Sequence, residues 1–82
     1  MPSIHELVAS ARRRLRDAGI PGAEADLDAR VIAQCLLQWD AARYFTDAIQ
    51  PAPDAFANAY GSAIDRRVQR EPVAYITGFQ EF

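Results

Sequence analysis

Apolar residues recur at helical spacing from the start of the chain. Ser3 and Glu6 have the spacing of a capping box, in which a hydroxyl and a carboxylate satisfy free backbone N–H groups at a helix N-terminus. The apolar side chains that follow stand three or four positions apart: Ile4, Leu7, Val8, Ala11, Leu15 and Ala18. Gly19 suits the position just past a helix C-terminus. The pattern therefore predicts a helix over 3–18.

A second pattern predicts a helix over 22–38. Its polar stripe repeats every four residues, at Asp26, Arg30 and Gln34. Most of the remaining circumference is apolar, which is typical of the central helix of a bundle. The residues of that apolar surface are Ala25, Leu27, Ala29, Val31, Ile32, Cys35, Leu36 and Leu37. Trp39 ends the pattern and is interpreted as a cover for the core.

Two further helices are predicted, over 41–46 and 55–70. Asp40 and Asp54 stand where each carboxylate can cap the helix that follows. In the longer helix, the inward-facing positions are Phe56, Tyr60, Ala63, Ile64 and Val68.

The end of the chain changes character at Pro72. The residue before a proline avoids the α region, so the preceding helix ends there. Proline also favours the first position of a helix and glycine the position after its end, which predicts a short helix over 72–77 before Gly78. A strand over the same residues is the rival interpretation, because several are β-branched or aromatic. The segment 79–82 is predicted to begin an extended strand.

Two charges fall on apolar faces of the predicted helices. Asp28 projects opposite the polar stripe of its helix, and Arg67 projects among the inward positions of the helix over 55–70. A buried charge is strongly destabilising unless it is paired. We therefore expect an Asp28–Arg67 ion pair that is structural rather than catalytic, with Arg66 or Arg70 as the alternative partner.

Composition narrows the possible functions. The chain has 82 residues, half of them hydrophobic, which together with the predicted helices indicates one small all-α bundle. Its formal net charge of −2 predicts no general affinity for nucleic acid or for membranes. Neither a signal peptide nor a run of about 18 apolar residues is present, which favours a cytoplasmic location. His5 is the only histidine and Cys35 the only cysteine in the sequence, and we expect no metal site, catalytic set or cofactor site.

One basic cluster, at residues 12–16, allows two interpretations. Arg12, Arg13 and Arg16 are possible partner-binding residues, since arginine suits paired and interfacial sites. The alternative is the solvated face of an amphipathic helix, with Leu15 turned inward.

The C-terminal segment RRVQREPVAYITGFQEF, residues 66–82, resembles a junction in the HemK/PrmC family of protein-glutamine methyltransferases. Members of that family carry a pattern like R-R-x-x-x-E-P-[VI]-A-[YH]-[IL]-T-G-x-x-E-F after the last long helix of an N-terminal helical domain. The upstream segment ADLDAR, residues 25–30, is similar to the second helix of that domain, including the inward aspartate.

The resemblance implies an intact protein that uses S-adenosylmethionine to methylate the glutamine side-chain amide of the Gly-Gly-Gln motif in peptide chain release factors. In that scheme residues 1–78 are the substrate-recognition domain and 79–82 begin a linker β-hairpin to a Rossmann-like catalytic domain. The family's Asn-Pro-Pro-Tyr motif and glycine-rich cofactor loop are absent from these 82 residues. This chain alone is therefore expected to be inactive and to bind no cofactor, and its partners would be a release factor and its own catalytic domain.

The apolar residues at the C-terminal end and the charge balance help to choose between alternative functions. Phe79 and Phe82 are interpreted as the first arm of a hairpin, and residues after Gly78 are expected to be poorly ordered or covered by another copy of the chain. A free-standing α-helical adaptor unrelated to methylation is the alternative function. A small nucleic-acid-binding protein is the third, which the acidic balance disfavours.

Overall fold

The computed structural model describes residues 2–77, and its elements within that range are five helices. They are α1 (Ile4–Asp17), α2 (Gly22–Leu37), α3 (Ala41–Asp47), α4 (Asp54–Val68) and α5 (Val73–Thr77). The predicted all-α bundle is confirmed there, with helix limits within two residues of those expected, and the short helix is correct where the strand was the rival. The expected extended segment 79–82 lies outside the described residues.

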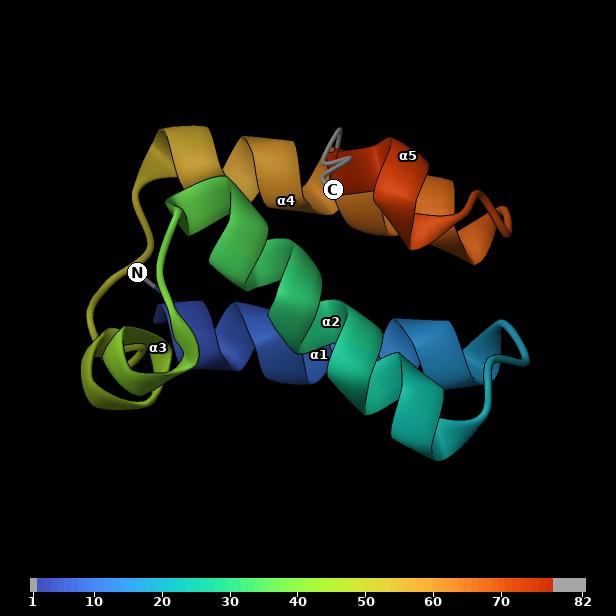
Figure 1. Cartoon of the computed structure of the whole chain (residues 1–82), viewed down its shortest axis with the longest axis horizontal. Helices are drawn as coiled ribbons and strands as arrows, with labels where there is room; N and C mark the ends of the chain where they lie inside the picture. The colour runs from blue at the N-terminus through green and yellow to red at the C-terminus, as the bar shows by residue number, and fades with distance from the viewer. Residues whose placement is uncertain (1, 78–82) are drawn as a thin grey trace.

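Helix α2 is the centre of the bundle, because it packs against α1, α4 and α5, and Figure 1 shows it crossing the molecule diagonally between α1 and α4. Its buried positions are Ala25, Ala29, Ile32 and Ala33. Three of these four residues are alanine, whose small side chain leaves room for the neighbouring helices to pack closely. Leu27 and Leu36, both expected on the apolar surface, are instead 48% and 39% exposed. Only part of the apolar surface of α2 is therefore buried in the core.

Local signals set both ends of α1. Ser3 Oγ accepts from the Glu6 N–H, and Glu6 Oε1 accepts from the Ser3 N–H at 2.7 Å, so the capping box is confirmed. At the other end Gly19 has φ +97°, and its N–H donates to the Arg16 carbonyl while the Ile20 N–H donates to the Leu15 carbonyl. This is the Schellman pattern, and it turns the chain toward α2.

Backbone pairing places α3 and the loop after it beside the N-terminus of α1 (Figure 1). The N–H groups of Ile4 and His5, which have no partner inside the helix, donate to the carbonyls of Gln50 and Ala48 at 3.1 and 2.9 Å. The Ala52 N–H donates to the Pro2 carbonyl at 3.0 Å. These bonds anchor the α3 end of the molecule to α1.

Helix α4 buries four of the five positions that its spacing predicts, Phe56, Tyr60, Ala63 and Ile64, and the fifth, Val68, is partly buried against the core. The expectation that Asp54 caps α4 is wrong. Pro53, in extended conformation, occupies the N-cap, and Asp54 is the first helical residue with no side-chain capping bond. A carboxylate in the first turn still interacts favourably with the helix dipole. At the far end Arg70 adopts φ 71°, and α5 then folds back onto α2 and α4.

Candidate functional site

The aspartate and arginine expected to meet do so between α2 and α4. Arg67 Nε donates to Asp28 Oδ2 at 2.9 Å, and the two side chains are 15% and 13% exposed. Arg67 Nη1 also donates to the backbone carbonyl of Glu71 at 3.3 Å. The guanidinium therefore joins the central helix to the turn that leads into α5.

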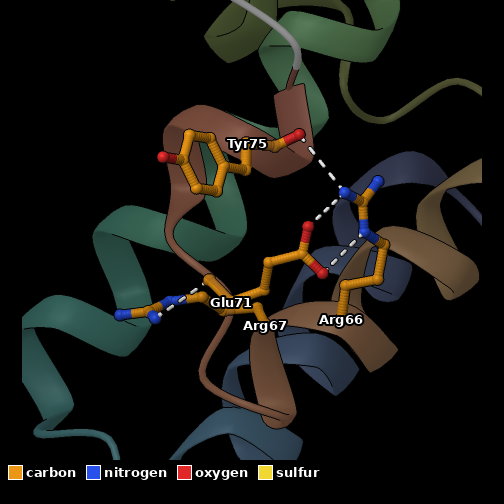
Figure 2. A network of polar contacts seen from close by, with 4 residues as sticks. All are labelled: Arg66, Arg67, Glu71 and Tyr75. Carbon is orange, nitrogen blue, oxygen red and sulfur yellow. Dashed lines mark hydrogen bonds and ion pairs between the residues drawn. The ribbon is translucent and has the colours of Figure 1, made fainter.

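A second arginine holds that turn from the other side. Figure 2 shows the Arg66 guanidinium facing the Glu71 carboxylate, with Arg67 on the opposite side of Glu71. Arg66 Nε donates to Glu71 Oε1 at 3.0 Å, and Arg66 Nη2 donates to Glu71 Oε2 and to the Tyr75 carbonyl. The hydrogen bond from Arg66 lowers the pKa of Glu71, and the same bond raises the pKa of Arg66. We call Asp28, Arg66, Arg67, Glu71 and the Tyr75 carbonyl the α4–α5 junction.

The junction has the chemistry of a structural connector. Its arginines are donors only, and each carboxylate is held by a guanidinium, so no group is free to accept and return a proton. Neither Arg66 nor Arg70 replaces Arg67 as the partner of Asp28: Arg66 binds Glu71, and Arg70 Nη2 donates to the Ala18 carbonyl at 2.8 Å.

The basic cluster of α1 is largely engaged within the bundle. Arg16 Nη2 contacts Asp26 Oδ1 at 2.8 Å and Arg12 Nε approaches the same oxygen at 3.6 Å. Arg14 pairs with Asp65 of α4. Arg13 is exposed and forms no ion pair with the rest of the described chain. Of the three candidate partner-binding arginines, only Arg13 is thus uncommitted.

A groove of about 670 Å³ lies between α1, α2 and α3, and sequence reasoning did not find it. Its apolar wall includes three side chains that are unusually exposed: Leu27 at 48%, Phe45 at 67% and Ile49 at 81%. Large exposed apolar side chains gathered at one place are typical of interaction surfaces. We call this feature the α1–α2–α3 groove; its polar lining is His5, Arg12, Asp26, Arg30 and Tyr44.

Two polar groups in the groove are only partly satisfied. Arg30 lies with its guanidinium carbon 5.7 Å from the Phe45 ring centroid, and its Nε is buried without a hydrogen-bond partner among residues 2–77. Tyr44 is 4% exposed, and burial raises the pKa of its hydroxyl. Two residues of the polar stripe of α2, Asp26 and Arg30, therefore line the groove rather than facing solvent alone. A weak signal was present in the sequence, because Asp26 and Arg30 are spaced to share that side of α2.

The described residues contain neither a cluster of candidate metal ligands nor a candidate membrane-spanning helix. Among residues 2–77 no three His, Cys, Asp or Glu side chains converge in a metal-binding group. None of the helices described there has the length and apolar character that crossing a bilayer requires.

Comparison with protein families identifies the bundle. A family model described as the PrmC N-terminal domain matches residues 6–78. The chain belongs to this family. No curated protein and no solved structure matches it. The match to a PrmC N-terminal domain confirms the resemblance drawn from residues 66–82 and places the chain in a methyltransferase family, as the N-terminal domain.

The α4–α5 junction explains in physical terms the first part of the segment, residues 66–82, that resembles the HemK/PrmC junction. Its two adjacent arginines bind different groups: Arg66 takes the Glu71 carboxylate, and Arg67 takes Asp28 and the Glu71 carbonyl. Pro72 follows directly, and its carbonyl accepts from the Tyr75 N–H at 3.0 Å to start α5. In this chain the arginine pair, Glu71 and Pro72 thus act together to fold α5 back onto the bundle.

Proposed function

We propose that this chain is the substrate-recognition domain of an S-adenosylmethionine-dependent, cytoplasmic protein-glutamine methyltransferase whose substrate is a peptide chain release factor. The match of residues 6–78 to the PrmC N-terminal domain carries the proposal. In the reaction the methyl group passes from the sulfonium to the side-chain amide nitrogen of the Gly-Gly-Gln glutamine. The amide loses a proton and S-adenosylhomocysteine leaves.

The role proposed for these helices is remote binding. Holding the body of the release factor away from the reacting amide supplies binding energy that positions the glutamine for attack. The α1–α2–α3 groove supports such a role, because it offers exposed apolar side chains beside arginine, a composition typical of protein interfaces. The catalytic and cofactor residues belong to the Rossmann-like domain that the proposal requires elsewhere in the protein.

Kinetics with two substrates test this role. Methyl transfer from radiolabelled S-adenosylmethionine is measured for the intact enzyme and for a variant that lacks residues 1–78, with whole release factor and with a short Gly-Gly-Gln peptide. We expect deletion to lower kcat/KM for the whole release factor at least tenfold while the peptide rate is retained. The peptide serves as the folding control for the catalytic domain. Equal activity of both enzymes on whole release factor contradicts the recognition role.

A further inference from the structure

We propose that the α1–α2–α3 groove binds a segment of the partner protein in which a carboxylate side chain is flanked by apolar side chains, with Arg30 and Tyr44 as the donors to that carboxylate. The inference rests on the proposed function and deepens it. It identifies the surface to which the release factor binds and the chemistry of the segment that the surface recognises.

The first observation is the Tyr44 hydroxyl. Buried tyrosine hydroxyls usually find a hydrogen-bond partner, and Tyr60 follows the rule, since its hydroxyl donates to the Ala29 carbonyl at 2.8 Å. Tyr44 as a whole residue is 4% exposed, but its hydroxyl is not fully enclosed, and no hydrogen bond joins it to another group among residues 2–77. A tyrosine hydroxyl, whose ordinary pKa is about 10, carries its proton at neutral pH and can donate. A donor that lines the groove is thus available to a ligand.

The second observation is the state of Arg30. Within the described chain its guanidinium has no carboxylate partner, its Nε is buried without a hydrogen bond, and it lies against the Phe45 ring. A cation–π contact with an aromatic ring restrains a guanidinium while leaving N–H groups at its edge for an acceptor. A carboxylate is the acceptor that a guanidinium binds best, often through two parallel hydrogen bonds.

The charge balance of the groove favours an anionic group. Among the described residues that line the groove, Asp26 alone carries a carboxylate, which is already held by Arg16 at 2.8 Å and Arg12 at 3.6 Å. The positive charge of Arg30 therefore has no carboxylate in the groove to neutralise it. The apolar walls disfavour nucleic acid, whose phosphates would need a basic surface, and the chain has a net charge of −2. A protein segment satisfies both the apolar wall and the spare cation.

A pair of small probes tests the chemistry of the groove. The ¹⁵N-labelled chain is titrated with 4-phenylbutyrate and with its uncharged analogue 4-phenyl-1-butanol, and amide shifts are followed by NMR. We expect the carboxylate to shift the amides of Leu27 and Ile49 and to bind at least fivefold more tightly than the alcohol. Tyr44→Phe and Arg30→Gln should each weaken carboxylate binding at least threefold, whereas Arg14→Gln, at a residue that pairs with Asp65 and does not line the groove, should not change it.

Variant folding is checked by circular dichroism. Tyr44→Phe keeps the buried ring, so the test remains decisive if Arg30→Gln does not fold. Equal affinity for both probes, or shifts confined to another face, overturns the inference.

A titration with whole, unlabelled release factor separates this inference from the proposed function. Loss of amide signal around the groove, reversed by 4-phenylbutyrate, supports both. Release-factor binding that leaves the groove amides unchanged overturns the inference and leaves the proposed function standing. If the release factor does not bind, the proposed recognition role and the groove's assigned partner both fail, while the probe titration still reports the carboxylate preference of the groove.

Discussion

Breaking the Asp28–Arg67 pair should destabilise the bundle strongly. Asp28→Leu leaves the Arg67 guanidinium without its carboxylate at a site where the two side chains are 15% and 13% exposed. Removing one partner of a fully buried pair costs about 3–5 kcal/mol, so the small remaining exposure gives an expected loss of about 2–3 kcal/mol. A domain of 82 residues has a free energy of unfolding of about 4–12 kcal/mol. The single substitution therefore removes a large share of the total stability.

The assay is urea unfolding of a double-mutant cycle: Asp28→Leu, Arg67→Met and the two combined. Trp39 packs against the core, so its fluorescence reports unfolding together with circular dichroism. With a slope of about 1 kcal/mol per molar urea, each single variant should lose about 2–3 M in its midpoint. The double variant should recover most of that loss, because two apolar side chains of similar volume replace a buried ion pair at little cost.

A matched control uses the exposed Arg14–Asp65 pair, which also joins two helices but whose side chains are 46% and 61% exposed. Arg14→Met and Asp65→Leu should each cost less than about 1 kcal/mol. The reasoning is refuted if Asp28→Leu and Arg67→Met each cost no more than these control variants and their effects simply add.

Three further outcomes follow from the structure. Gly19→Ala should lower the free energy of unfolding by about 1–2 kcal/mol in the same urea assay, because Gly19 has φ +97° and a Cβ there would lie 2.9 Å from Arg70 Nη2; unchanged stability would contradict this. Ser3→Ala should cost about 1 kcal/mol through loss of the capping box, and a loss below 0.3 kcal/mol, roughly the resolution of such assays, would show that the box contributes little. Arg66 lowers the pKa of Glu71 in the folded chain. The stabilising contribution of the Glu71 carboxylate is therefore present above its unfolded pKa of about 4.3 and is lost as the pH falls through the folded pKa. Glu71→Gln should reduce the loss of stability between about pH 5 and pH 3, and identical pH profiles of the two proteins would refute this linkage.

The sequence predicted most of the secondary structure because its helix signals are local. Ser3 with Glu6 and the left-handed Gly19 mark the two ends of α1, and both act within a few residues of chain. Local reasoning failed at Asp54, where the helix begins one residue earlier than the capping rule suggests. It also gave no sign that Gln38 and Arg70 would adopt positive φ, because neither residue type favours that conformation.

Helical projection also brought Asp28 and Arg67 to facing sides of two helices, since a regular helix fixes the direction of each side chain from sequence position alone. The α1–α2–α3 groove was decided only by the tertiary structure. It depends on backbone bonds from Ile4 and His5 to the loop around Ala48, and such bonds carry no side-chain signature. Those contacts set α3 beside α1, and the groove lies between these two helices and the face of α2 that carries Arg30. Sequence spacing states which face of a helix a residue occupies, but which other element meets that face is a property of the folded chain.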